Sequence, residues 1–149
     1  MYFAGGSTAL LLGIRGQTVD IDIKLDPEPE GAFEAIALLK TSLNVNVELA
    51  SPDDFIPPCP GWRERSILID TIGQVKFFHY DLFTQALAKL ERGHDQDLSD
   101  VSEFIKRGFI KPGDLDREFS KIRTALIRYP AINADQFEQK LKDFLNKFK

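Results

Sequence analysis

The first eighty residues alternate between apolar and polar positions with the period of β-strands. This alternation runs over residues 18–25 and returns over residues 45–49. A period of two is typical of strands with one buried face. Three more strands are expected over residues 2–4, 66–72 and 74–80, the last two joined in a hairpin near Gly73. Between the strands, helices are expected over residues 8–12, ended by Gly13 or Gly16, and over residues 31–42.

The pattern changes to the helical period after Tyr80. Apolar residues then recur every three to four positions in four stretches, which predicts four helices. Their apolar stripes contain Leu82, Phe83, Ala86, Leu87 and Leu90; Leu98, Val101, Phe104 and Ile105; Leu115, Phe119, Ile122 and Leu126; and Phe137, Leu141, Phe144, Leu145 and Phe148. Strands mixed with helices early and helices alone later predict an α+β fold, a small mixed β-sheet flanked by helices with a C-terminal helical segment.

Composition and charge limit the classes of protein to which the chain can belong. The chain has 149 residues and a net charge of −4, which argues against a bulk nucleic-acid binder. A single cysteine, Cys59, excludes an internal disulfide framework and a thiolate metal cluster. No apolar run approaches the roughly 18 residues of a membrane span, and no signal segment is visible, so we expect a soluble cytoplasmic protein with no membrane partner. Residues 111–149 carry nine basic and six acidic residues, a net of +3, whereas residues 1–110 carry −7, and an acidic part suits a divalent cation.

Two short motifs stand close together along the chain and have a joint chemical use. Gly5-Gly6-Ser7 follows a predicted strand, where glycine lets the backbone approach a phosphate without a Cβ in the way. Asp20 and Asp22 lie two residues apart on the next strand, so their carboxylates share one face. Hard divalent ions such as Mg²⁺ take carboxylate oxygens together with substrate phosphates. Each motif alone is more often structural, a plain turn or a solvated polar face, but the two together suit one nucleoside triphosphate.

This combination resembles the signature of the DNA polymerase β-type nucleotidyltransferase superfamily: Gly5-Gly6-Ser7, twelve residues, then Asp20-Ile21-Asp22 between apolar flanks. The chain is more closely similar to a prokaryotic branch that includes the abortive-infection (type IV toxin–antitoxin) nucleotidyltransferases. That likeness rests on Lys89-Leu90, on Arg92 and on Asp97-Leu98-Ser99-Asp100-Val101. The resemblance implies a minimal nucleotidyltransferase-like domain over residues 1–107, with residues 108–149 as a helical extension packed on the same domain.

The resemblance also implies roles for the residues at matching positions. Gly5, Gly6 and Ser7 would bind the triphosphate, and Asp20 and Asp22 would hold Mg²⁺ or Mn²⁺. The superfamily carries a third carboxylate on a later strand. Glu48 has the right strand context and is the first candidate, with Asp70 the second.

The second part of the resemblance implies that Lys89 and Arg92 contact nucleotide phosphates. It also implies that Asp97 or Asp100 is a second acidic group, and Asp100 could supply a general base. The helical periodicity agrees in part with these roles, because Lys89 and Arg92 belong to a polar line opposite the apolar stripe of their helix. The ammonium group of a lysine offers a point charge to a phosphate. Asp97 falls within an apolar arc, where a carboxylate needs a partner. Asp97 is alternatively a good N-cap, with Asp100 at the third helical position.

Three further residues have a structural interpretation that we favour over a functional one. His79 is expected to be packed or at the surface, and His94 to face solvent, rather than to be catalytic. Trp62, in a proline-rich loop over residues 51–65, could stack a base but is expected to anchor that loop.

The leading hypothesis is a nucleotidyltransferase that binds a Mg²⁺–nucleoside triphosphate and transfers a nucleotidyl group to an acceptor, with RNA or a protein as the candidates. The rival is a catalytically inactive module of the same fold that acts as a binding partner or antitoxin-like component. A third hypothesis is a sugar-nucleotide enzyme that uses Asp20 and Asp22 as a metal clamp, but this leaves the glycine motif without a use.

Overall fold

The computed structural model describes residues 1–149, and the contacts among them divide the chain into two compact units. Unit 1 comprises Met1–Ser51 and Ser66–Tyr80, and unit 2 comprises Pro52–Arg65 and Asp81–Lys149. We expected a domain boundary near residue 107. The two units divide the chain at other positions, and the expected boundary stays a prediction.

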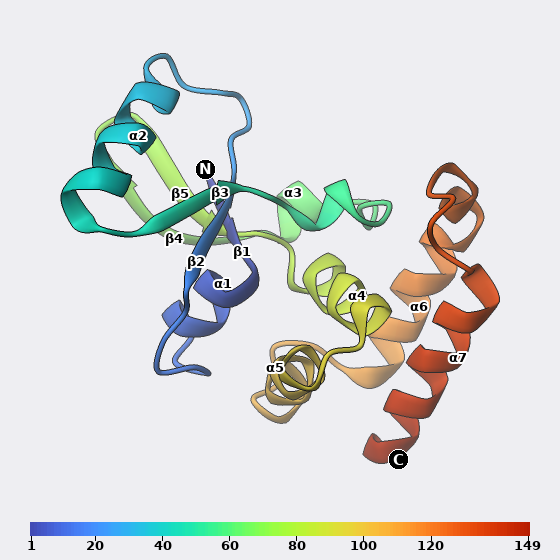
Figure 1. Ribbon diagram of the computed structural model, residues 1–149. Coiled ribbons are helices and arrows are strands. Elements are labelled where there is room, and N and C mark those ends of the chain that lie inside the picture. Colours follow the sequence, from blue (N-terminus) through green and yellow to red (C-terminus); the bar gives the residue numbers. More distant parts are fainter. The chain divides into compact units, whose positions relative to one another are not determined.

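Unit 1 is a five-stranded mixed sheet with two helices (Figure 1). Its strands are β1 (Tyr2–Ala4), β2 (Asp20–Lys24), β3 (Asn46–Leu49), β4 (Ile67–Ile72) and β5 (Val75–His79), and its helices are α1 (Gly5–Leu11) and α2 (Ala32–Leu43). The strand order is β3-β2-β1-β5-β4. The pairs β1–β2 and β4–β5 are antiparallel, whereas β1–β5 and β2–β3 are parallel. This mixed sheet with helices confirms the predicted α+β fold class.

The passage from β1 to α1 has no connecting loop. We expected a turn at Gly5-Gly6-Ser7 and a helix from residue 8, but α1 already begins at Gly5. Gly5 has φ +58°, in the left-handed region that favours glycine, so the chain changes direction within one residue. The expected turn is therefore the first turn of the helix, and it stands directly at the end of the central strand of the sheet.

Aromatic and buried polar side chains hold the middle of this sheet together. The rings of Tyr2 and Phe78 stack with their centroids 5.2 Å apart, across the β1–β5 pair. His79 is buried, and its Nδ1 lies 3.4 Å from the hydroxyl of Thr8 on α1. Burial lowers the pKa of His79, so its imidazole is neutral near pH 7. His79 is thus packed, as expected from its strand.

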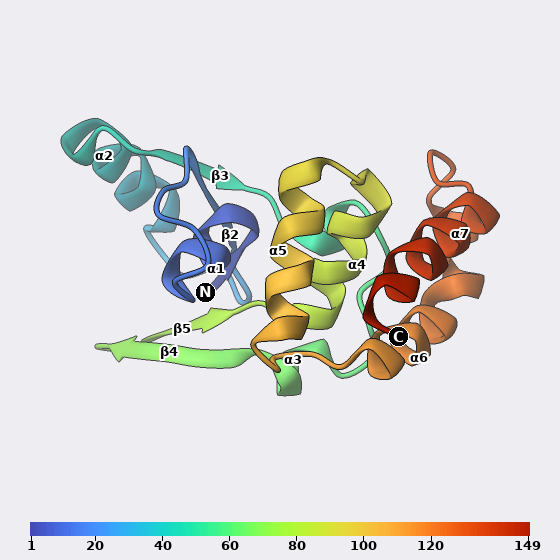
Figure 2. The same ribbon diagram turned by 90° about the horizontal axis from the view of Figure 1, so that it is seen from below.

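Unit 2 is helical and is built around α4. Its helices are α3 (Trp62–Arg65), α4 (Leu82–Arg92), α5 (Asp95–Lys106), α6 (Pro112–Ile122) and α7 (Ala134–Leu145), with short 3₁₀ segments at Pro52–Asp54, Arg123–Arg128 and Asn146–Phe148. Helix α4 contacts α5, α6 and α7, and α6 lies beside α7 (Figures 1 and 2). None of these helices has the length and the apolar character that crossing a bilayer requires.

Most residues of the four predicted apolar stripes are buried in unit 2, and two residues of the polar line on α4 are buried as well. Gln85 and Lys89 are both buried, because α4 is covered around most of its circumference by the other helices. A helix at the centre of a bundle has no solvent face. The third predicted helix also stops earlier than its stripe, since α6 ends at Ile122 and the chain continues as a 3₁₀ segment through Leu126.

The proline-rich loop is fixed to α4 by a buried carboxylate. Asp81 accepts hydrogen bonds from Arg65 Nε and Nη2, both at 3.0 Å, and from the backbone N–H of Thr84 at 3.1 Å. The bond to Asp81 raises the pKa of Arg65. Trp62 is buried, with the Arg63 guanidinium 4.4 Å from its ring centroid, so Trp62 anchors the loop as expected.

The only cysteine allows a test of packing in unit 2. Burial raises the pKa of Cys59 to about 12, from an ordinary value of 9.0. Because the thiolate is the reactive form, its population in the folded protein falls about 1,000-fold. We expect the native protein at pH 8 to react with Ellman's reagent at least about 1,000 times more slowly than the protein unfolded in guanidinium chloride. Fast labelling of the native protein would contradict the packing described here.

Candidate functional site

Strands β2 and β3 bring four polar side chains to one face of the sheet in unit 1. Asp20 pairs with Asn46 and Asp22 pairs with Glu48, and residues opposite each other on neighbouring strands share a face. Asn46 Nδ2 donates to Asp20 Oδ1 at 2.6 Å and to Glu48 Oε1 at 2.9 Å. Asp20 and Asp22 are half-buried and Glu48 is exposed. The first candidate for a third carboxylate therefore stands beside the predicted pair.

The start of α1 lies directly against this acidic face. A Cβ on Gly5 would lie 2.2 Å from Asp22 Oδ2, so the Asp22 carboxylate would have to shift to admit a side chain there. The Ser7 hydroxyl donates to the carbonyl oxygen of Asp20 at 3.4 Å. Glycine is favoured at position 5 by its positive φ, and it lets the Asp22 carboxylate lie directly against the backbone. The glycine motif and the acidic pair thus meet, as their order along the chain led us to expect.

The loop after α1 also folds back onto the glycine pair. A Cβ on Gly6 would lie 2.2 Å from Thr18 Oγ1 and 3.3 Å from Arg15 Nη1. Sequence reasoning missed Arg15 and Thr18, because a loop has no period from which contacts can be inferred. It also missed Asn46, although the alternation of residues 45–49 already places Asn46 and Glu48 on one face.

The oxygen donors of this face suit a hard divalent cation. Carboxylates are the ligands that Mg²⁺ and Mn²⁺ prefer, and Mg²⁺ is commonly held by one or two carboxylates together with substrate phosphates. The Asp22 carboxylate lies against the Gly5 backbone, where a Cβ would otherwise be. No group of three or more His, Cys, Asp or Glu side chains is arranged to hold a metal ion. Asp20 and Asp22 fit such a cation as a pair.

Asp70, the second candidate for the third carboxylate, lies elsewhere on the sheet. It belongs to β4, which is separated from β2 by β1 and β5, so about 14 Å of sheet lies between β4 and β2. Its Oδ1 accepts a hydrogen bond from the N–H of Thr71 at 2.7 Å. The sheet therefore brings Glu48, and not Asp70, next to the acidic pair.

The remaining predicted residues meet in unit 2, between α4 and α5. Lys89 Nζ donates to Asp100 Oδ2 at 2.7 Å and to Asp97 Oδ1 at 3.2 Å, while Arg92 Nη2 donates to Asp97 Oδ1 at 2.9 Å. Lys89, Asp97 and Asp100 are all buried. Two cations thus face two carboxylates, so each buried charge has an opposite charge beside it that offsets the cost of its desolvation. Their predicted roles at a phosphate stay predictions.

The structure decides between the two local interpretations of Asp97. Helix α5 begins at Asp95 and its N-cap is His94, so Asp97 is the third helical residue and not the cap. The N-cap interpretation is therefore wrong, because the helix begins two residues earlier than Asp97. The alternative is confirmed, since Asp97 lies in the apolar arc and finds its partners in Lys89 and Arg92.

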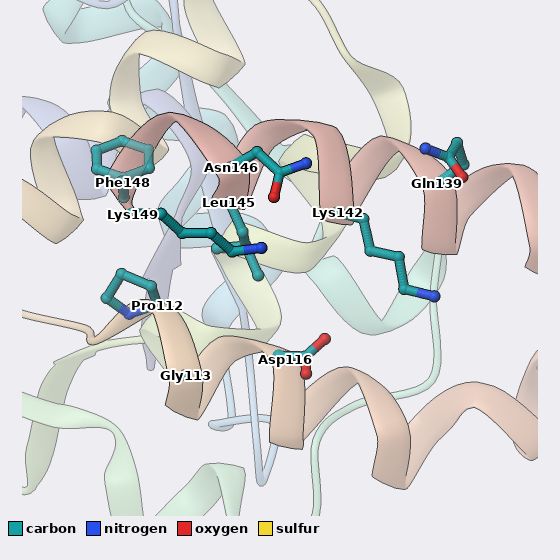
Figure 3. A pocket seen from close by; sticks show the side chains of 9 residues that line it. All are labelled: Pro112, Gly113, Asp116, Gln139, Lys142, Leu145, Asn146, Phe148 and Lys149. Carbon is teal, nitrogen blue, oxygen red and sulfur yellow. The ribbon is translucent and has the colours of Figure 1, made fainter.

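Unit 2 contains a separate cavity of about 610 Å³ between α6 and α7 (Figure 3). Asp116 on α6 and Lys142 on α7 point into the space between the two helices (Figure 3). The lining residues are Pro112, Gly113, Asp116, Gln139, Lys142, Leu145, Asn146, Phe148 and Lys149. None of the candidate site residues named from the sequence lines this cavity, which instead includes Leu145 and Phe148 of the fourth apolar stripe.

Comparison with known families gives a match over nearly the whole chain. A family model described as a nucleotidyltransferase of unknown function (DUF6036) matches residues 3–148. No curated protein and no solved structure matches the chain. The closer likeness to the abortive-infection branch stays a prediction.

Proposed function

The chain belongs to a family of nucleotidyltransferases, and from this premise we propose that unit 1 binds a Mg²⁺–nucleoside triphosphate and transfers its nucleotidyl group to an acceptor. RNA or a protein is the candidate acceptor, and a toxin-like role is compatible with either. Nucleoside triphosphates are metabolites of the cell interior, so the proposal keeps the cytoplasmic location expected from the sequence.

One observation carries the proposal: the glycine pair at the start of α1 touches the carboxylate face of β2. A Cβ on Gly5 would lie 2.2 Å from Asp22 Oδ2, so the Gly5 backbone and the Asp22 carboxylate are direct neighbours. A triphosphate with its metal needs both kinds of neighbour, because its phosphate oxygens require close backbone approach and its metal requires carboxylates. A structural turn or a solvated strand face would need neither.

Each residue of the site has a defined task in the proposed reaction. Asp20 and Asp22 would hold Mg²⁺ or Mn²⁺, which when bound neutralises charge on the triphosphate. Gly5, Gly6 and Ser7 would border the phosphates, and Asn46 restrains the Asp20 carboxylate through its 2.6 Å hydrogen bond. An acceptor hydroxyl forms a bond to the α-phosphorus while the bond to pyrophosphate breaks. The proton of that hydroxyl passes to a carboxylate, for which the exposed Glu48 is the candidate.

Titration calorimetry with ATP, GTP, CTP and UTP tests the proposal. We expect at least one of the four to bind in the presence of Mg²⁺, and binding to be lost when EDTA removes the metal. Incorporation of α-³²P-labelled nucleotide into total RNA, and into protein in a cell extract, then tests the transfer step.

The outcomes separate the proposal from its rival. Metal-dependent binding with transfer of label supports a nucleotidyltransferase. Binding of a triphosphate without transfer of label to RNA or protein favours a nucleotide-binding module. No binding of any of the four triphosphates in Mg²⁺ would contradict the proposal and favour an inactive module of the same fold.

A further inference from the structure

A guanidinium group stands at the glycine pair in unit 1, on the loop that follows α1. Arg15 Nη1 lies 3.3 Å from the position that a Cβ on Gly6 would take, and the preceding glycine has Asp22 Oδ2 at 2.2 Å from the corresponding position. Two consecutive glycines thus border a carboxylate and a guanidinium. Both residues are half-buried, so neither charge is fully screened by solvent.

The loop that carries Arg15 is tied down at both ends. The backbone N–H groups of Ile14 and Arg15 donate to the carbonyl oxygen of Ala9 at 2.8 and 3.2 Å, which folds the chain back along α1. At the other end, the Thr18 hydroxyl donates to the carbonyl oxygen of Asp20 at 3.0 Å. Arg15 is therefore presented to the glycine pair by a short, hydrogen-bonded connection, which lowers the entropy cost of using its side chain as a ligand.

The negative charge of the site and of its proposed ligand favours a cation at the position of Arg15. Asp20, Asp22 and Glu48 place three carboxylates on this face, and a triphosphate with one Mg²⁺ still carries net negative charge. A cation next to the phosphates offsets this repulsion. Arginine is suited to the task because its planar fork donates two parallel hydrogen bonds to phosphate oxygens.

The cations that the sequence had suggested belong to unit 2. Lys89 and Arg92 pair with Asp97 and Asp100 inside unit 2. In unit 1, Arg15 is a cation that lies at the glycine motif itself. We propose that Arg15 is a phosphate-binding residue of the site, and that it contacts the triphosphate from the side of Gly6 while Asp20 and Asp22 hold the metal. This inference rests on the proposed function.

Calorimetry with four proteins and two kinds of ligand tests Arg15 separately from that function. The proteins are the wild type, Arg15→Gln, Arg15→Lys and Lys40→Gln, the last removing one positive charge from the exposed face of α2 in the same unit. The ligands are the four nucleoside triphosphates and inorganic tripolyphosphate, all with Mg²⁺. We expect Arg15→Gln to weaken binding at least about tenfold, Arg15→Lys to weaken it less, and Lys40→Gln to leave it unchanged.

The outcomes test the role of Arg15 and the proposed function of unit 1 separately. If the wild type binds a triphosphate and Arg15→Gln binds it equally well, Arg15 is not a ligand but the proposed function stands. If tripolyphosphate binds in an Arg15-dependent way and no nucleoside triphosphate binds, the phosphate-binding role of Arg15 is supported and the proposed function is contradicted. If neither ligand binds the wild type, both are overturned.

A second measurement avoids the risk that Arg15→Gln does not fold. Wild-type protein is treated with phenylglyoxal, and modification of Arg15 is followed by peptide mass spectrometry. We expect Mg²⁺-tripolyphosphate to slow modification of Arg15 but not of Arg117, an exposed arginine on α6. Equal rates with and without the ligand would overturn the assignment of Arg15.

Discussion

Replacement of Asp22 by asparagine is expected to weaken binding of the best-bound Mg²⁺–nucleoside triphosphate by at least about 100-fold. Loss of a residue that merely supports a metal ligand already costs 10–100-fold, and Asp22 is proposed as a ligand itself. Asparagine keeps the size and a carbonyl oxygen but removes the charge that a hard cation prefers. Asp20→Asn should act in the same direction. Calorimetry with and without Mg²⁺ measures the effect, and the residual binding of both variants should no longer depend on the metal.

Asp70→Asn provides the matched control. It makes the same chemical change on the same sheet, but on β4, which is separated from β2 by two strands. We expect this variant to bind the triphosphate as the wild type does. The metal site would be refuted at β2 if Asp22→Asn kept Mg²⁺-dependent affinity, and Asp70 would return as a ligand if its own replacement abolished that affinity.

The acidic face could be predicted from the sequence because it depends on a local rule. Residues two apart on a strand share a face, so Asp20 and Asp22 were paired without knowledge of the rest of the fold. The residues of β3 that lie opposite this acidic pair could not be predicted by a local rule. Asp22 stands opposite Glu48 because α2 carries the chain back into a parallel pair with a particular register, and that register is set by the packing of the whole unit.

Burial and loop geometry account for what the sequence did not indicate. Lys89 was expected on a polar line because periodicity describes one helix at a time, whereas in unit 2 other helices cover the polar side of α4 and supply its carboxylate partners. Arg15 had no periodic context at all. Its place follows from two hydrogen bonds to one carbonyl oxygen at the end of α1, which composition and spacing do not encode. The acidic residues on strands could thus be paired from the sequence, whereas Arg15 and Thr18 on the loop and Asn46 on β3 were missed.

A second large effect is expected on stability, at the carboxylate that joins the proline-rich loop to α4. Replacing Asp81 by alanine should lower the free energy of unfolding by about 3 kcal/mol. Asp81 is 1% exposed and accepts from Arg65 and from the first turn of α4. Its loss removes an N-cap and leaves the Arg65 guanidinium with only the Glu118 carboxylate, at 3.6 Å, as a counter-charge. We take the lower end of the usual range for a broken buried pair because the Arg65 side chain is 30% exposed. Urea denaturation of both proteins gives the difference.

Two companion variants separate the cap from the ion pair. Asp81→Asn keeps an oxygen that can accept from the Thr84 N–H, so it should lose only the part of the stability due to Arg65, roughly half. Arg65→Ala combined with Asp81→Ala should cost less than the sum of the two single changes, because each single variant removes the hydrogen-bonded partner of the residue that is left. If Asp81→Ala stays within about 1 kcal/mol of the wild type, the loop is held by apolar packing around Trp62 and Cys59, and the carboxylate is not its principal anchor.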